Sequence, residues 1–193
     1  GVDALTHALE GWMSQFANAQ TDGYNRTAVR LILNNLETAC NEPANLAARD
    51  AMALGSHYAG LCLSTSAVGY VHAIAHQLGA RYGVPHGRAN AMVLPHVLAF
   101  NQPACVKKLG SLARDLELAH AGATDSAAAE ALSARVRELL AKLPLRRSGS
   151  LIKREDYARI ANDALTEAHG MYAVPRYMTE EDVYRVLDGV AAG

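Results

Sequence analysis

The chain has 193 residues, and its 18 basic side chains nearly balance its 19 acidic ones, which leaves a formal net charge of −1 at pH 7. Proteins that hold nucleic acid or anionic membranes need clustered Lys and Arg, so this balance argues against both kinds of partner. The longest apolar stretches are shorter than the roughly 18 residues that span a bilayer, and we expect no transmembrane segment.

The start of the sequence, GVDALTH, has no initiator Met and lacks the basic and apolar segments of a signal peptide. It looks like the inside of a helix, so we expect the chain to be a piece of a longer protein. Alanine is very frequent, aromatic residues make up only 6%, and β-branched runs are nearly absent. Helix formers therefore dominate, and the sequence predicts one all-α domain over residues 1–193.

Helical periodicity and the positions of Gly and Pro divide the chain into predicted helices. In chain order these cover 3–16, 22–38, 43–61, 65–82, 88–100, 104–119, 126–143, 154–167 and 180–190. The segment 65–82 is apolar on all sides, so its helix should be buried near the centre. Pro95 is expected to kink or break the helix that it interrupts. Residues 145–150 look most like a linker, but no domain boundary is required.

Cap residues indicate where several of these helices begin. Asp22 is the expected cap of the second helix, and Pro43 suits the first turn of the third. Thr179 precedes three acidic residues, which the positive end of a helix dipole favours, and Ser126 is placed in a similar way.

The three cysteines are odd in number and far apart. Cys40, Cys62 and Cys105 each lie in an apolar or helical context, which is typical of buried thiols in a reducing compartment. We therefore expect a cytoplasmic protein without a disulfide or Cys–zinc framework.

Histidine spacing is the most informative feature. His72 and His76 lie one turn apart in the apolar segment 65–82, and Asp3 and His7 repeat this spacing in the first helix. A buried imidazole needs a partner for each nitrogen, and a metal ion is one such partner. His86, between Pro85 and Gly87, can point back at the end of the preceding helix.

These positions predict an Asp/His₃ set made of Asp3, His7, His72 and His86. Imidazole and carboxylate ligands suit Fe, Zn, Ni or Cu, and the lack of a sulfur ligand favours a site with an open position for substrate or water. A purely structural cluster of hydrogen-bonded imidazoles is the alternative. The other histidines, His57, His96, His120 and His169, are interpreted as surface or capping residues, although His96 is kept as a candidate because it lies in the same apolar segment as His86.

Three segments carry the motifs of a known family. They read DALTHALE at 3–10, GYVHAIAHQLGA at 69–80 and PHGRANA at 85–91, and His86 lies fourteen positions after His72. Together with Leu94-Pro95 and the closing Val174-Pro175-Arg176 and Thr179-Glu180-Glu181-Asp182, they resemble the C-terminal half of the iron-containing (group III) alcohol dehydrogenases. The resemblance covers the whole chain, and Val174 departs from the usual Asn.

This resemblance implies a helical domain like the C-terminal domain of dehydroquinate synthase. It implies that Asp3, His7, His72 and His86 are ligands of a catalytic Fe²⁺, or Zn²⁺ in some relatives. His76 would not be a ligand but would lie beside the nicotinamide and substrate, as a catalytic and cofactor-binding residue. The implied reaction is oxidation of an alcohol to an aldehyde or ketone, or the reverse, by hydride transfer at a metal-polarised oxygen.

Family members also carry an N-terminal domain that binds NAD(P), and this sequence has no GxGxxG pattern after a strand. NAD or NADP would therefore be bound mainly by the missing domain, and we expect this chain alone to be inactive. Its expected partners are a small alcohol or aldehyde, that missing domain and, as in many relatives, further copies of itself. Leu63 and Tyr172 are candidate substrate contacts.

Other functions remain as alternatives. A glycerol dehydrogenase, a maleylacetate reductase or a hydroxyacid–oxoacid transhydrogenase would share the fold, although the intact His and Asp positions favour a metal-dependent member. A metal-free helical interaction module is the alternative from a different class. A helical HD-type metallohydrolase needs a His-Asp dipeptide, and none occurs here.

Overall fold

The computed structural model describes residues 1–145 and 151–192, and within these ranges it is helical without a strand. The α-helices are α1 (Val2–Met13), α2 (Ala19–Asn41), α3 (Leu46–Leu61), α4 (Leu63–Ser66), α5 (Tyr70–Tyr82), α6 (His86–Asp115), α7 (Asp125–Lys142), α8 (Tyr157–Met171) and α9 (Glu180–Ala192). A short 3-10 helix, η2 (Arg154–Asp156), precedes α8. The all-α prediction is confirmed.

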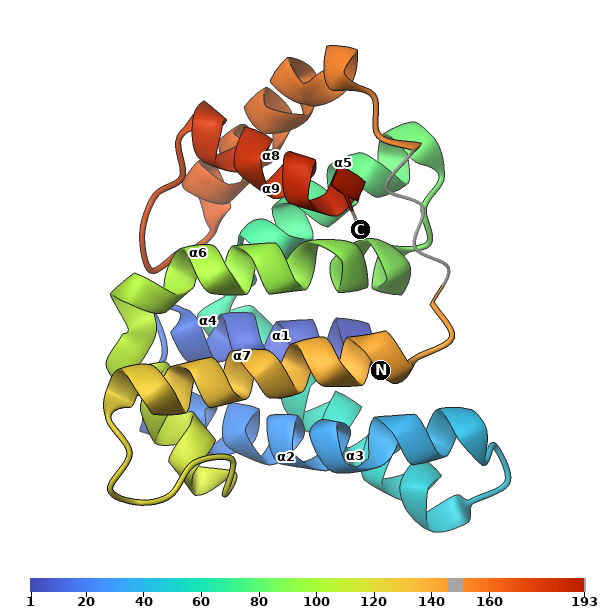
Figure 1. The fold of residues 1–193 in the computed structure, drawn as a ribbon, viewed down its shortest axis with the longest axis vertical. Coiled ribbons are helices and arrows are strands. Elements are labelled where there is room, and N and C mark those ends of the chain that lie inside the picture. The colour runs from blue at the N-terminus through green and yellow to red at the C-terminus, as the bar shows by residue number, and fades with distance from the viewer. Residues whose placement is uncertain (146–150, 193) are drawn as a thin grey trace.

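The helices stack along the long axis of the molecule (Figure 1). Helices α2 and α3 form one end, α8 and α9 form the other, and α1, α6 and α7 lie between them. Helix α1 packs against α2, α3 and α6 and also touches α5, while α5 packs between α6 and α8. The first turn of α1 is therefore close to both helices that carry the predicted histidines.

Helix α1 is buried on most of its surface. Leu5 and Leu9 are fully buried, as are Tyr70 and Ile74 of α5. Burial of such large side chains stabilises a fold by about 1.5–3 kcal/mol each. Residues 68–75 are buried, as the apolar composition of 65–82 predicts, whereas Thr65, His76 and Ala80 of that segment are exposed.

The start of this central helix differs from the prediction. Helix α5 begins at Tyr70 rather than at residue 65, because the chain first forms the single turn α4 and then an extended link. Ala67 in this link has a φ of 56°, a left-handed conformation that a continuous helix cannot contain. The link brings the backbone of residues 69–71 toward α1.

Helix α6 corrects a second prediction. It runs unbroken from His86 to Asp115 and contains both Pro95 and Pro103, so the two separate helices expected over 88–100 and 104–119 are one. Each proline removes one backbone hydrogen bond, but neither ends the helix. Figure 1 shows α6 bending partway along its length.

The caps are partly as expected. Thr179 and Asp182 exchange hydrogen bonds at the start of α9, which confirms that cap. Asn18 rather than Asp22 caps α2 through a reciprocal capping box with Thr21, and Thr124 rather than Ser126 caps α7. Helix α3 is capped by Asn45, two residues beyond Pro43.

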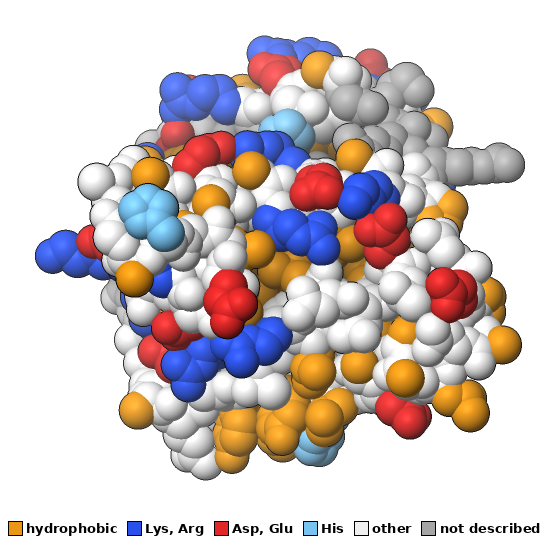
Figure 2. All heavy atoms as spheres, turned by 60° about the horizontal axis from the view of Figure 1, so that its bottom comes forward, with side chains coloured by type: hydrophobic (Ala, Val, Ile, Leu, Met, Phe, Trp, Pro, Cys, Tyr) orange, Lys and Arg blue, Asp and Glu red, His pale blue; other side chains and the backbone are white. Residues whose placement is uncertain are grey.

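The cysteine prediction is wrong in one case: Cys62 and Cys105 are buried, but Cys40 is exposed. Residues 146–150 of the proposed linker lie outside the described residues. On the face shown in Figure 2, acidic and basic side chains lie interspersed rather than in blocks of one sign. In the described part of the chain, no helix combines the length and the hydropathy needed to cross a membrane.

Candidate active site

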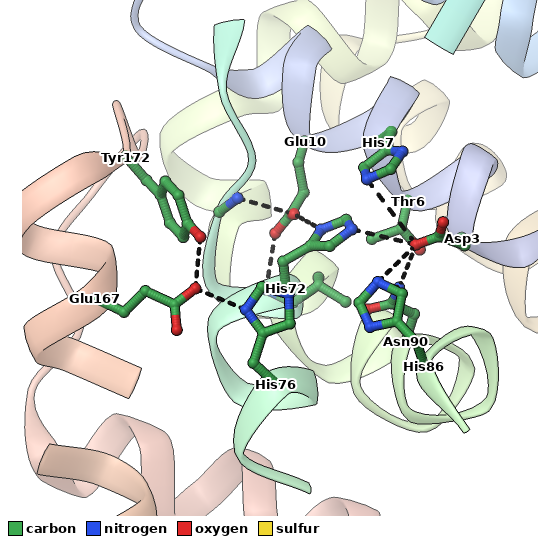
Figure 3. A network of polar contacts seen from close by, with 12 residues as sticks. Asp3, Thr6, His7, Glu10, His72, His76, His86, Asn90, Glu167 and Tyr172 are labelled. Carbon is green, nitrogen blue, oxygen red and sulfur yellow. Dashed lines mark hydrogen bonds and ion pairs between the residues drawn. The ribbon is translucent and has the colours of Figure 1, made fainter. Parts of the chain in front are cut away.

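Three helices bring polar side chains to one point (Figure 3). Asp3 comes from the first turn of α1, His72 from the first turn of α5, and His86 from the start of α6. Asp3 Oδ1 lies 3.0 Å from His86 Nε2 and 3.3 Å from His72 Nε2. Among the described residues, these are the one group whose His, Cys, Asp or Glu ligand atoms all lie within 4.8 Å of one another.

The spacing of these atoms fits a metal ion. Two ligand atoms that each lie about 2.1 Å from one ion are about 3.0–3.4 Å apart when they subtend 90–109° at the ion. The two distances from Asp3 Oδ1 fall in this range. A carboxylate with imidazoles is also the donor chemistry that a divalent first-row metal prefers. The residues present therefore fit the ion that the sequence predicts.

His7 lies beside this group rather than in it. Its ring stacks on that of His72, with centroids 4.4 Å apart and planes at 4°. Its Nε2 is 3.9 Å from Asp3 Oδ1, longer than the two closer pairs. Burial, together with the neighbouring charge of His72, lowers the pKa of His7.

Glu10 is a buried carboxylate on α1, and it determines how His72 is oriented. One oxygen, Oε2, accepts from Gly69 N at 2.8 Å and lies 2.6 Å from His72 Nδ1, while Oε1 accepts from Val71 N at 2.7 Å. A carboxylate can only accept here, so Nδ1 carries the hydrogen and Nε2 faces Asp3. Gly69 is required because a Cβ there would lie 2.8 Å from Glu10 Oε1.

The electrostatics of the cluster favour a positive charge between Asp3 and Glu10. Burial opposes the charge on His72, but its hydrogen bonds to Asp3 and Glu10 outweigh that cost and raise the pKa of His72 to about 9. The hydrogen bond from His72 outweighs burial at Asp3 and, with charges on nearby histidines, lowers the pKa of Asp3 to about 2. Two carboxylates that face one imidazole in this way suit a bound cation.

Asn90 supports the same carboxylate. It is fully buried on α6, and its Nδ2 donates to Asp3 Oδ1 at 2.7 Å while lying 3.3 Å from His86 Nε2. The amide therefore helps to fix the carboxylate of Asp3 against α6.

His76 lies one turn beyond His72 and is 43% exposed at its side chain. Its ring stacks near that of His86, with centroids 5.3 Å apart and planes at 19°. Its Nδ1 is 2.7 Å from Glu167 Oε1 of α8, and the Tyr172 hydroxyl donates to the same oxygen at 2.5 Å. Thus His76 turns one nitrogen toward α8 and away from the Asp3 group.

A cavity of about 370 Å³ opens over these histidines. It is lined by His7, Leu63, Ala67, Val68, His72, His76, His86, Met171 and Tyr172. Both candidate substrate contacts, Leu63 and Tyr172, therefore line the same cavity as the histidines. The exposed lining is mostly apolar, and four imidazoles are among its polar groups, as in many small-molecule sites.

The remaining histidines lie outside this cavity. His57, His120 and His169 are exposed, and His169 also makes a 2.7 Å hydrogen bond with the hydroxyl of Tyr70. His96 is half-buried on α6 and lines a separate groove with Gly189 and Arg137.

A family model for the C-terminal part of Fe-containing alcohol dehydrogenases matches residues 1–190. The chain belongs to this family. A curated relative, 1,3-propanediol dehydrogenase of Klebsiella pneumoniae, is 37% identical over 97% of this chain and 49% of its own length. Lactaldehyde reductase of Escherichia coli K12 is 36% identical over 95% of this chain and 48% of its own length. The chain thus spans about half the length of the curated relatives it matches.

Solved structures of Fe-containing alcohol dehydrogenases have the same fold. A 1,3-propanediol oxidoreductase superimposes with a TM-score of 0.92 at 36% identity, over 98% of this chain and 50% of the other. An alcohol dehydrogenase from Oenococcus oeni gives a TM-score of 0.90 at 31% identity, with the same coverage of 98% and 50%.

Sequence reasoning about this Fe-containing alcohol dehydrogenase family member missed Glu10, Asn90 and Glu167. Glu10 lies at i+7 from Asp3 and thus on the same helical face, and it is an acidic residue in a buried helix. Asn90 lies at i+4 from His86 and shares its face. Those two spacings could have identified both residues, but nothing local links Glu167 to His76, since 91 positions separate them.

Proposed function

We propose that this chain is the metal-binding, catalytic part of an NAD(P)-dependent alcohol dehydrogenase that interconverts a small alcohol and its aldehyde or ketone. The observation that carries the proposal is that His86 Nε2 and His72 Nε2 lie 3.0 and 3.3 Å, respectively, from Asp3 Oδ1. Family membership supports the reaction class. The relatives called 1,3-propanediol dehydrogenase and lactaldehyde reductase support a short substrate with more than one oxygen.

Asp3, His72 and His86 would hold Fe²⁺ or Zn²⁺, and His7 is the proposed fourth ligand because its Nε2 faces the same carboxylate oxygen. When bound, such an ion acts as a Lewis acid that polarises a carbonyl or lowers the pKa of an alcohol. Glu10 and Asn90 would orient the first two ligands, as partners of metal-binding residues commonly do.

His76 is the proposed residue for proton transfer. It lines the same cavity, is accessible from it, and presents an imidazole that can take a proton from the alcohol during oxidation and return it during reduction. The substrate and the nicotinamide would lie against this ring.

The other half of the longer protein would bind NAD or NADP and close the cavity. Two large apolar side chains at its edge support a covering partner, because Leu63 is 44% exposed and Met171 is 70% exposed. The relatives are about twice as long as this chain, and the part of the longer protein that corresponds to their additional residues would cover this surface.

Metal analysis tests the proposed site. The chain, reconstituted with Fe²⁺ or Zn²⁺ and freed of unbound ion, is expected to hold about one ion per chain by elemental mass spectrometry. Asp3→Ala and His72→Ala should each abolish this binding, whereas His57→Ala, an exposed histidine outside the cavity, should not. If the unsubstituted chain binds no ion, the metal-site proposal is wrong and the cluster is a hydrogen-bonded network only.

Turnover measurements test whether metal binding and NAD(P) binding belong to different halves of the longer protein. With Fe²⁺, NAD(P)⁺ and a short diol, we expect no activity from the chain alone and activity from the longer protein that contains it. Robust turnover by the chain alone would contradict a separate cofactor-binding half.

A further inference from the structure

Helix α8 and the residue that follows it contribute two polar side chains that the metal cluster does not use. Glu167 lies near the C-terminal end of α8, and Tyr172 is the C-cap residue of this helix. A single oxygen, Glu167 Oε1, receives the Tyr172 hydroxyl at 2.5 Å and lies 2.7 Å from His76 Nδ1 (Figure 3). These three residues form a chain of hydrogen bonds that ends on the ring proposed for proton transfer.

We infer that Glu167 and Tyr172 are positioning residues that fix the orientation and tautomer of His76. This inference rests on the proposed function, in which His76 moves the proton. A carboxylate accepts and cannot donate, so His76 must carry its hydrogen on Nδ1. Its Nε2 then keeps a free lone pair on the other side of the ring, as the acceptor that an alcohol proton needs.

Tyr172 holds the carboxylate in place. Glu167 is only 21% exposed at its side chain, yet without a second partner it could rotate toward solvent. Burial, and then the hydrogen bond to Glu167, raises the pKa of Tyr172, so the phenol stays protonated and donates. Because Tyr172 also lines the cavity, a substrate bound there would lie beside this positioning residue.

The helix that carries Glu167 is itself tied to α5. Arg81, near the end of α5, pairs with Asp163, one turn before Glu167. Near the C-terminal end of α8, His169 Nε2 lies 2.7 Å from the buried hydroxyl of Tyr70, and this hydroxyl also accepts from Met178 N, which lies beyond α8, at 2.8 Å. Contacts on both sides therefore hold Glu167 at a fixed distance from His76, as positioning by a side chain from another helix requires.

Substitutions in the full-length enzyme test this role kinetically. Glu167→Ala is expected to lower kcat about 10–100-fold without a matching rise in KM. Glu167→Gln keeps an acceptor oxygen and should retain most of the activity. Tyr172→Phe removes one supporting hydrogen bond and should lower kcat about 2–10-fold. Thr166→Ala, an exposed neighbour on α8, serves as the matched control and should be unchanged.

The tautomer of His76 gives a readout that a merely structural role would not change. Long-range ¹H–¹⁵N spectra at about pH 8.5, where an ordinary histidine is neutral, should show His76 as the Nδ1–H form in the unsubstituted chain. Glu167→Ala should shift it toward the Nε2–H form, with metal content and thermal unfolding unchanged.

Two results would overturn the inference: an unchanged His76 tautomer in Glu167→Ala, or equal kcat values for Glu167→Ala and the unsubstituted enzyme. Failure of the proposed function is a different result, since it would appear as the absence of bound metal in the unsubstituted chain. The tautomer measurement needs neither metal nor turnover, so the two outcomes are separable.

Discussion

Replacing Glu10 with Ala tests whether one buried carboxylate supports both the fold and the metal site. The side chain is 1% exposed and accepts three hydrogen bonds, from Gly69 N, Val71 N and His72 Nδ1. All three donors lie at the start of α5, whereas Glu10 lies on α1. The substitution therefore removes three hydrogen bonds that join α1 to the start of α5.

The structure sets the size of the effect. A buried donor left without an acceptor costs about 1–3 kcal/mol. Two effects reduce the summed cost of three unpaired donors. Water can enter the vacated space and accept from them, and the variant no longer has to bury a charged carboxylate. We expect Glu10→Ala to lower the free energy of unfolding by about 3–5 kcal/mol, a large part of the 5–15 kcal/mol typical of a domain.

Glu10→Gln separates the hydrogen bonds from the charge. A Gln carbonyl at the place of Oε2 still accepts from Gly69 N and His72 Nδ1, but its NH₂ group then faces the N–H of Val71. One mismatched buried donor predicts a loss of about 1–3 kcal/mol. Glu155→Ala, at an exposed position of η2, is the control and should stay within about 0.5 kcal/mol of the unsubstituted chain.

Urea unfolding followed by circular dichroism gives these free energies, with the slope checked for equality between variants. The affinity for Zn²⁺ of the variants that remain folded should fall about 10–100-fold in Glu10→Ala. A Glu10→Ala chain that unfolds within about 1 kcal/mol of the unsubstituted one would refute the reasoning, because three buried donors could not then depend on this side chain.

Three further predictions concern packing and burial in the rest of the chain and at the start of α5. Gly110→Ala would place a Cβ 2.8 Å from the backbone of α7 and should destabilise the chain by about 1–3 kcal/mol, whereas Gly23→Ala, with nothing within 4 Å, should stabilise it by about 0.5–1 kcal/mol in urea titrations. Tyr70→Phe should cost about 1–3 kcal/mol in the same assay, because it leaves a buried backbone N–H without an acceptor. Iodoacetamide should modify the exposed Cys40 first, as read by mass spectrometry, since burial raises the pKa of Cys105 to about 11; equal labelling of the two would contradict this burial.

Composition and periodicity were sufficient for the fold class because helix propensity and the spacing of apolar residues are local properties of a sequence. The continuous helix through Pro95 and Pro103 was not predictable in this way. A proline costs a helix about 3 kcal/mol or more, and sequence alone does not show that α6 regains this by packing against α1, α5, α7 and α9. Similarly, the link before α5 depends on the contact between Glu10 and Gly69, which are 59 residues apart.

The site residues show the same difference between what local spacing predicts and what long-range packing determines. Asp3 with His7, and His72 with His76, are local pairs whose spacing reveals a shared helical face. Their meeting with His86 requires the packing of α1 against α5 and α6. The sequence predicted that meeting because buried imidazoles need partners, and the resemblance to a family supported it, but neither predicted which helices pack together. Glu167 could not be found in either way, because it reaches His76 from a helix that carries no part of the motif.

These contacts separate substitutions into two kinds. Glu10 and Gly69 hold α1 against α5 through the same atoms that orient His72, so changes there should lower stability and metal affinity together. Glu167 lies at a partly exposed helix end and touches His76 on the side away from Asp3, so its loss should alter the chemistry and leave the fold intact. A variant series that plots metal affinity against unfolding free energy should therefore place Glu10 variants on a common trend and Glu167 variants at the unsubstituted values. If Glu167→Ala instead followed the Glu10 trend, α8 would be part of the metal-binding core and not a separate support for His76.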